Sequence, residues 1–207
     1  MKIHILTALW KRPKITDVFI QGCKRLGYPV TASISETSYI SICEANNINW
    51  IMTPNKPLGA KWNSGLRQSL IHEWDYLLIL GSDDLISNCL INRYMTYTGW
   101  DMIGVRDMYV YKDGAIKYFR YNQERSVGAG RLIKRSAIEK CGMLWSDHKN
   151  KGLDGHCSKR LRMKRLKEIA INMGDSIVVD IKSDTNMNSF EKLEGEIVDV
   201  ELKLPEL

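Results

Sequence analysis

The sequence predicts an α/β fold in which a single domain, residues 1–207, holds a mostly parallel central sheet flanked by helices. Short apolar segments alternate along the chain with helical segments, the order that produces crossover connections between parallel strands. One apolar segment, Tyr76 to Leu80, shows no polar alternation, which is typical of a strand covered by helices on both faces. A chain of this length also fits one domain with one core.

The composition is that of a globular protein with a basic balance of charge. Hydrophobic residues make up 44% and charged residues 26% of the chain, both ordinary values. The net charge of +6 favours anionic ligands, without separating a nucleotide from a nucleic acid or a membrane surface. Five scattered cysteines with no C-x-x-C pair argue against a disulfide framework and a structural zinc site. No apolar run approaches the roughly 18 residues of a membrane span, and the features of a signal peptide are missing, so we expect a soluble cytoplasmic protein.

The first hundred residues are expected to supply the parallel part of the sheet. Residues 2–8 form the first strand, and Pro13 suits the first turn of the next helix, where its missing N–H is not needed. A later helix is indicated by Trp62, Leu66 and Leu70, which recur at a four-residue spacing. The other elements predicted here are strands at 29–35, 48–53 and 76–80 and a helix at 38–45.

The second half is expected to add a hairpin and several short elements. Residues 107–121 form the hairpin, which turns at Lys112-Asp113-Gly114. Gly142 ends a short helix at 136–141. The other predictions are a helix through 86–95 and strands at 102–105, 130–134, 176–181 and 197–204. The last two strands show no pattern that indicates chemistry.

Two adjacent carboxylates, Asp83 and Asp84, follow the apolar strand directly. They are therefore expected at the carboxyl edge of a central strand, where open α/β sheets bind ligands. Like charges this close raise the pKa of one carboxyl unless a cation is present, which favours a divalent metal bound through oxygen. The alternative is that one carboxylate caps the next helix and the other is solvated.

A second polar stretch, Gly152 to His156, precedes another helical segment. The pattern leaves open whether Asp154 is a helix N-cap or a functional carboxylate, and whether His156 is a metal ligand or a partly buried polar side chain. Six cations then fall within residues 159–167. Such a cluster either binds phosphate groups or forms a solvated helix face.

Five segments carry a family likeness through their order along the chain. They are Thr7-Ala8-Leu9-Trp10-Lys11-Arg12, Gly59 through Asn63-Ser64-Gly65, Leu80-Gly81-Ser82-Asp83-Asp84, Gly130 through Gly142, and Leu153-Asp154. Taken together they resemble the inverting, nucleotide-sugar-dependent glycosyltransferases of the GT-A fold, the large family 2 type, and especially the short versions found in bacteria and their phages. The resemblance covers roughly residues 2–165. It implies a Rossmann-like domain with a nucleotide-sugar and metal half at 1–100, an acceptor half at 101–165, and C-terminal strands at 166–207.

The resemblance also implies an activity and a set of site residues. The activity is metal-dependent transfer of a sugar from a nucleotide-sugar donor to an acceptor hydroxyl, with inversion, in the cytoplasm of a bacterium or a phage-infected host. Mn²⁺ or Mg²⁺ would be bound by Asp83 and Asp84, with His156 as an additional ligand, and Asp154 would be the catalytic base. The implied donor-binding residues are Thr7, Ala8, Leu9, Arg12, Glu36, Lys61, Asn63, Ser82, Asp83 and Arg160.

Two departures from the family pattern bear on these assignments. Gly81 replaces the first Asp of the family's Asp-x-Asp, which removes a carboxylate from the donor ribose or the metal. Leu153 replaces the Glu that precedes the base. The first departure bears on metal affinity and the second on the catalytic assignment.

Several alternatives follow. The acceptor hydroxyl belongs either to a modified DNA base, held through the basic cluster, or to a glycan or lipid carrier. A catalytically degenerate module that binds a nucleotide or nucleic acid is favoured by the two missing carboxylates. A nucleotidyltransferase of related fold is disfavoured, because no Gly-rich segment bearing Lys or Arg follows the first strand.

Overall fold

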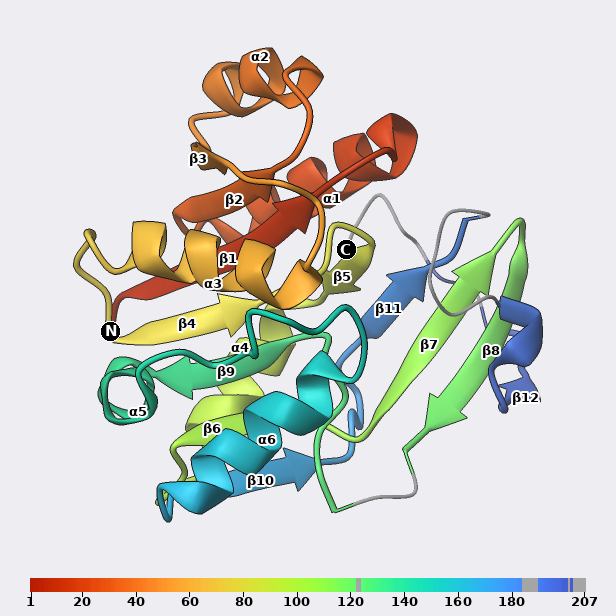
Figure 1. The fold of residues 1–207 in the computed structure, drawn as a ribbon. Helices are drawn as coiled ribbons and strands as arrows, with labels where there is room; N and C mark the ends of the chain where they lie inside the picture. Colours follow the sequence, from red (N-terminus) through yellow and green to blue (C-terminus); the bar gives the residue numbers. More distant parts are fainter. Residues whose placement is uncertain (122–123, 184–189, 201, 203–207) are drawn as a thin grey trace.

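The computed structural model describes residues 1–121, 124–183, 190–200 and 202, which fold around two sheets. The larger sheet has seven strands in the order β10-β6-β9-β4-β1-β2-β3. The smaller has five, in the order β12-β8-β7-β11-β5. Figure 1 shows the smaller sheet beside the carboxyl ends of the central strands of the larger one.

The first half of the chain builds one side of the large sheet from parallel crossover units. β1 (Ile3–Leu9), β2 (Val30–Ile34), β3 (Asn49–Met52) and β4 (Tyr76–Ile79) are parallel to one another. The connecting helices are α1 (Pro13–Leu26), α2 (Ser38–Ala45) and α3 (Leu58–Ser69). Because the strands are parallel, all four carboxyl ends meet at one edge of the sheet.

The second half completes the large sheet with one reversed strand. β9 (Arg131–Lys134) lies between β4 and β6 (Met102–Val105) and is antiparallel to both, while β10 (Glu168–Ile171) is parallel to β6. β9 therefore begins at the edge where β4 and β6 end, and Ile79 pairs with Arg131. The helices α5 (Arg135–Cys141) and α6 (Leu153–Met163) follow β9.

The small sheet joins segments that are far apart in the sequence. The hairpin of β7 (Asp107–Lys112) and β8 (Ala115–Arg120) turns through Asp113 and Gly114, which both have positive φ. β11 (Val178–Ile181) lies parallel to β7 and antiparallel to the short β5 (Asp84–Ile86). A short 3-10 helix, Phe190–Lys192, and β12 (Glu196–Ile197) lie beside the hairpin. β11 thus brings the late part of the chain against the end of β4.

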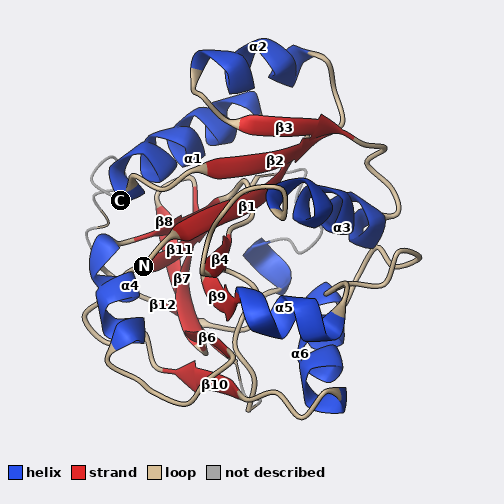
Figure 2. Ribbon diagram, turned by 90° about the vertical axis from the view of Figure 1, so that its left-hand side faces the viewer, coloured by secondary structure: helices blue, strands red, loops and turns tan. Residues whose placement is uncertain are grey.

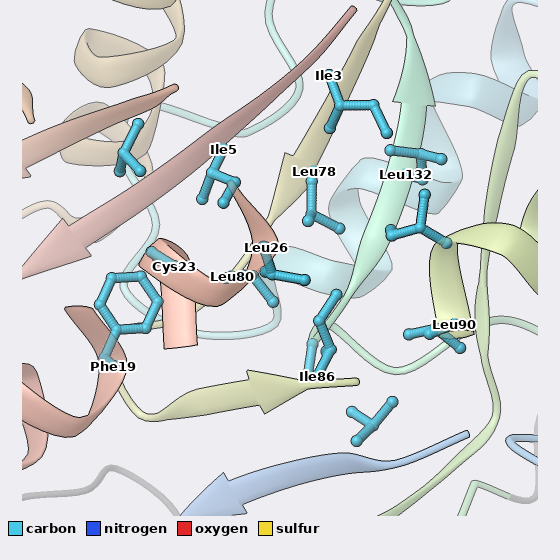
Figure 3. Close-up of a cluster of buried hydrophobic side chains, with 14 of the residues drawn as sticks. Ile3, Ile5, Phe19, Cys23, Leu26, Leu78, Leu80, Ile86, Leu90 and Leu132 are labelled. Carbon is cyan, nitrogen blue, oxygen red and sulfur yellow. The ribbon is translucent and has the colours of Figure 1, made fainter. Parts of the chain in front are cut away.

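Helices cover both faces of the large sheet (Figure 2), with α1 and α4 (Asn88–Met95) on one face and α3, α5 and α6 on the other. Figure 3 shows the core under the first face, where Ile5, Leu78 and Leu132 of the sheet belong to one cluster with Leu26 of α1 and Leu90 of α4. A second buried cluster, including Leu77, Ile133 and Leu161, lies under the other face. The central strands are thus buried on both faces, as their unbroken apolar sequence predicts.

The predicted fold class is confirmed, and three predicted elements need correction. The helix placed at 86–95 begins only at Asn88, because β5 first pairs with β11. The basic segment 159–167, a candidate helix face, is helical only as far as Met163, and β10 begins directly after it at Glu168. The strand placed at 197–204 is represented by Glu196–Ile197, and residues 201 and 203–207 lie outside the described part of the chain. Among the described residues, no helix has the length and apolar character needed to cross a membrane.

Candidate active site

Side chains from several strand ends gather at the carboxyl edge of the large sheet. Arg12 follows β1, Glu36 follows β2, and Ser82 and Asp83 follow β4. The hydrogen bond from the Gly130 N–H to the Ile79 carbonyl, 3.0 Å, holds the start of β9 at the same edge. Surface hollows at the amino ends of β1 and β4, lined by residues such as His72 and Trp74, lie at the opposite edge.

Three carboxylates form the centre of this edge. One oxygen from each of Asp83, Asp84 and Asp180 lies within 4.8 Å of the others. Asp180 comes from β11, where it stands directly opposite Asp84 in an antiparallel pair, and directly opposed side chains lie on the same face of a sheet. The Ile181 N–H also donates to the Asp83 carbonyl at 2.8 Å. The strand pairing therefore brings a third carboxylate to the predicted pair.

Gly81 is explained by how closely these carboxylates approach the backbone. Its N–H donates to Asp84 Oδ2 at 2.6 Å. A Cβ atom at this position would lie 2.7 Å from Asp83 Oδ1 and 2.9 Å from Asp84 Oδ2, distances that side-chain carbons do not adopt. The departure from Asp-x-Asp is therefore part of the local packing, and the third carboxylate of this site stands on β11.

Burial and mutual repulsion change the proton affinities of two of the three acids. Burial, followed by the charges of Asp83 and Asp180, raises the pKa of Asp84 well above its usual value. Burial and the charge of Asp83 raise the pKa of Asp180 to about 6, although Lys182 opposes the shift. Asp180 Oδ1 is buried and has no hydrogen-bond partner. An all-oxygen donor set with an unpartnered oxygen fits a hard divalent cation such as Mg²⁺ or Mn²⁺, which would offset this repulsion.

Within the described part of the chain, two cations contact the carboxylates. Arg12 Nη1 donates to Asp83 Oδ2 at 2.5 Å and Nη2 donates to Ser82 Oγ at 3.0 Å. Lys182, two residues after Asp180, donates from Nζ to Asp180 Oδ2 at 2.5 Å. The side chains of Arg12 and Asp83 keep 18% and 16% of their surface exposed, so the cluster can be reached from solvent.

The residues expected to contact the nucleotide line the adjacent part of the edge. Thr7 is fully buried with an unpartnered Oγ1, whereas Ala8 is partly exposed. Glu36 accepts a hydrogen bond from the Lys11 N–H at 3.1 Å. Lys61 is 1% exposed and donates from Nζ to the Leu9 carbonyl at 2.7 Å. Burial lowers the pKa of Lys61 to about 8, against the opposing charge of Glu36, so this ammonium is a structural tie to the end of β1.

Asp154 lies beside the same edge, where its backbone carbonyl contacts Arg131 at the start of β9. It stands in the first turn of α6, whose N-cap residue is Gly152, and its side chain makes no capping hydrogen bond. The carboxylate is exposed and accepts no hydrogen bond from the described residues, while it lies close against Gly128, where a Cβ would come within 2.6 Å of Oδ1. The N-cap alternative is therefore wrong. Leu153, in the place of the family's Glu, packs against the core.

A buried arginine connects Asp154 to the sheet. Arg131, the first residue of β9, is 1% exposed. Its guanidinium donates to the Asp154 carbonyl at 3.0 Å, to the Ser126 carbonyl at 2.6 Å and to the Val127 carbonyl at 2.9 Å. Glu168 of β10 accepts from the Ser126 N–H and Oγ, both at 2.9 Å, and lies 3.9 Å from Arg131. This network fixes the first turn of α6 beside the ends of β4 and β6.

Two of the expected site residues, Asn63 and Arg160, have other partners, and a third, His156, lies apart from the carboxylates. The Asn63 amide is buried and bonds to Trp145 and to Asp147 Oδ1, so it holds the loop before α6. Arg160 Nη1 donates to the Met143 carbonyl at 2.7 Å, about 9 Å along α6 from Asp154. His156 is half-buried on α6, and the structure does not bring it into the carboxylate cluster. None of the three is thus placed at the carboxylates in this conformation.

The sequence reasoning missed Asp180, Lys182 and Arg131. The tail strands were judged to carry no chemistry, which is wrong, because Asp180 joins the carboxylate cluster. A signal was present: Val178-Val179-Asp180-Ile181 places one acid inside an otherwise apolar strand, and a buried carboxylate needs a partner. Arg131 stands similarly at the start of the apolar β9.

Comparison with known proteins identifies the fold. No protein-family model matches the sequence, and neither does any curated protein. The structure is similar to TarS 1–349 from S. aureus, with a TM-score of 0.62 and 11% identity over 89% of this chain and 59% of that chain. It is similar to the inositol-1-phosphate CTP transferase from T. maritima, with a TM-score of 0.59 and 12% identity over 93% and 94%. The corresponding values for CMP:2-keto-3-deoxy-manno-octonic acid synthetase complexed with CTP are 0.53, 12%, 91% and 94%.

These matches differ in the share of each matched structure that the chain covers. It spans 59% of the length of TarS 1–349 and nearly all of the two CTP-related enzymes. Identities of 11–12% support a statement about architecture alone. The chain has the GT-A-like fold that is shared by nucleotidyl- and nucleotide-sugar-dependent transferases.

Proposed function

We propose that this protein transfers a sugar from a nucleotide-sugar donor to an acceptor hydroxyl, with inversion at the sugar carbon and with the help of Mn²⁺ or Mg²⁺. The observation that carries the proposal is the convergence at one sheet edge of the Asp83, Asp84 and Asp180 carboxylates with the exposed Asp154 carboxylate. The first group suits a cation and a diphosphate, and the second suits a proton acceptor.

On the donor side, the chain supplies both ligands and counter-charges. Asp83, Asp84 and Asp180 would hold the cation, which when bound neutralises negative charge on the departing nucleoside diphosphate. The nucleotide would lie across the ends of β1 and β2, with its base against the partly exposed Ala8 and near Glu36. Arg12, beside Asp83, is placed to meet the diphosphate.

On the acceptor side, Asp154 would take the proton of the attacking hydroxyl. Its carboxylate is exposed, makes no capping bond and accepts no hydrogen bond from the described residues, so its oxygens are available to an acceptor. Arg131 fixes the backbone carbonyl of Asp154, and a general base acts only when it is held within hydrogen-bond reach of the proton it removes. A glycan or a lipid carrier suits the exposed carboxylate as well as a DNA base does.

The decisive experiment measures binding and products together. Calorimetry with uridine, cytidine and guanosine diphosphates should show binding in Mn²⁺ and little in a chelator. Incubation with the matching nucleotide sugars should then release nucleoside diphosphate, slowly to water and faster with the correct acceptor. Equal nucleotide affinity with and without Mn²⁺ would remove the metal from the proposal. Binding without any release would favour the degenerate module.

A nucleotidyltransferase is the second candidate, and one observation favours it. The two CTP-related structures are matched over nearly their whole length, whereas TarS 1–349 is matched over 59%. The two reactions differ in their products, because nucleotidyl transfer from a nucleoside triphosphate releases pyrophosphate. Pyrophosphate formed from CTP and a sugar phosphate would therefore replace our proposal with this one.

A further inference from the structure

We infer that Arg12 and Lys182 are exchangeable counter-ions, which release the site carboxylates to a divalent cation and then bind the donor diphosphate. The inference rests on the proposed function, and it adds Lys182, a residue outside the segments that resemble the family, to the donor site. It also gives Arg12 two successive partners.

Each cation contacts a carboxylate oxygen that a metal could also use. Arg12 Nη1 lies 2.5 Å from Asp83 Oδ2, and Lys182 Nζ lies 2.5 Å from Asp180 Oδ2. Oxygen ligands lie about 2.0–2.6 Å from Mg²⁺ or Ca²⁺, so a nitrogen and a metal compete for the same oxygen lone pairs. The three carboxylates are also close enough, within 4.8 Å, to share one ion.

The charge balance gives the direction of the exchange. Among the described residues, the three carboxylates, when all are ionised, exceed the two cations that contact them by one negative charge. A divalent cation reverses this sign and leaves Arg12 and Lys182 facing excess positive charge. The negatively charged diphosphate of a donor then becomes their best partner, through charge-assisted hydrogen bonds. Metal and diphosphate are therefore expected to bind in a mutually reinforcing way.

The exchange requires each side chain to move only over a short distance. Arg12 follows Lys11, which has a positive φ, and lies in the loop before α1 with part of its side chain exposed. Lys182 is the first residue beyond β11, and its backbone N–H is fixed to the Tyr111 carbonyl at 2.8 Å. Only the flexible stems have to change rotamer, so the strands keep their pairing.

The inference predicts effects of opposite sign from one substitution. In Arg12→Gln, Mn²⁺ alone should bind more tightly than to the unmodified protein, by about tenfold, because a competitor for Asp83 is gone. Uridine diphosphate, or whichever nucleoside diphosphate binds, should bind about tenfold more weakly at saturating Mn²⁺. Lys182→Met, which keeps an apolar stem, should repeat both changes.

Titration calorimetry with Mn²⁺ alone and then with the nucleoside diphosphate tests this. Lys14→Gln removes the same charge from an exposed site two residues from Arg12 and should change neither affinity, while circular dichroism confirms folding. Mn²⁺ affinity that stays constant or falls in both variants would overturn the exchange. An unmodified protein that binds Mn²⁺ but no nucleoside diphosphate would instead overturn the proposed function, and with it the second half of the exchange.

Discussion

The proposed donor and acceptor sides of this sheet edge both contain buried charged groups, but these groups differ in how far their charge is balanced by neighbours. On the donor side, Asp84 and Asp180 are buried as direct neighbours, and the pKa of each is raised. On the acceptor side, the buried charge is Arg131, whose guanidinium donates to three carbonyl oxygens. The buried carboxylates therefore repel one another, whereas the buried guanidinium has hydrogen-bond acceptors for its charge.

This difference indicates which side is built to bind a charged ligand and which is built to hold a geometry. A group whose charge is opposed by its surroundings gains when a ligand of opposite charge arrives. A group that is already fully bonded gains nothing from a ligand, and it stabilises the segments that it joins. The carboxylates of the donor edge are therefore expected to lower the stability of the fold and to favour cation binding. The Arg131 network contributes stability and positions Asp154.

The largest expected effect comes from Asp154→Asn. Asn keeps the shape of the side chain but cannot accept a proton at neutral pH, so transfer should fall by roughly two to four orders of magnitude. Binding of Mn²⁺ and nucleotide should stay nearly intact. Asp83→Asn, measured beside it, should weaken both binding steps. If Asp154→Asn transfers sugar at close to the normal rate, the base must be sought elsewhere, with Asp147 and Glu139 the next candidates.

Removing the buried guanidinium in Arg131→Met should produce the next largest effect. Three carbonyl acceptors would each lose one donor and Glu168 would lose the cation beside it, which costs about 3 kcal/mol in the free energy of unfolding. Urea denaturation measures this value. Lys134→Met, in the same strand but partly exposed, is the matched control and should change it by much less.

If Arg131 positions Asp154, a second substitution should separate this role from its effect on stability. Arg131→Lys retains charge and should recover part of the stability, yet a single ammonium cannot reproduce the three carbonyl contacts. The rate of transfer should therefore stay low while KM for the donor is nearly normal. Recovery of stability together with the full rate would show that Arg131 is structural only.

The sequence predicts the donor side better than the acceptor side for a physical reason. Asp83 and Asp84 follow an apolar strand directly, and Arg12 follows another, so local order along the chain predicts where they lie. Asp180 reaches the site through the pairing of β5 with β11, a contact across about half of the chain. No local pattern encodes that pairing, and the last residue of β5, Ile86, is predicted as the start of a helix.

The acceptor side was predicted by resemblance and not by pattern. Asp154 fitted a helix N-cap equally well from sequence, and only the backbone shows that Gly152 is the N-cap residue. Asn63 is expected at the donor because it stands near the start of a helix, and Arg160 because its charge could bind the diphosphate. Their hydrogen bonds to Trp145 and Met143 depend on loop packing that the sequence does not reveal.

Asp84→Asn tests the repulsion between Asp84 and the neighbouring carboxylates, and it should change the stability less than the Arg131 substitution does. Asn can keep the hydrogen bond from the Gly81 N–H while its amide donates to a neighbouring carboxylate. Because the pKa of Asp84 is raised in the folded protein, its ionised form costs stability above that pKa. The variant should therefore melt a few degrees higher at neutral pH and bind Mn²⁺ more weakly.

The sign of this effect can be checked with pH. The folded protein holds the Asp84 proton more tightly than the unfolded chain does, so the cost is absent at acid pH and grows as pH rises toward the folded pKa. Thermal denaturation at pH 7.5 and at pH 4.5 should show a clearly larger gain at the higher pH, and Asp17→Asn, on the exposed face of α1, should show none at either. A lower melting temperature for Asp84→Asn at neutral pH would mean that the donor edge stores no repulsion.

The smallest effect is expected from the exposed cations Arg162, Lys164 and Arg165 at the end of α6. Replacing them tests whether the acceptor is a nucleic acid. If the acceptor is DNA, replacing all three with Gln should weaken duplex binding a few-fold at moderate salt. The slope of log affinity against log salt should then fall by roughly 0.9 for each lost phosphate contact.

The matched control replaces the exposed Lys14, Lys24 and Lys56 with Gln, which removes the same net charge far from α6 in the sequence. Equal weakening by both triples would reduce the effect to net charge, and unchanged binding would leave the α6 cations as a solvated helix face and favour a glycan or lipid-carrier acceptor.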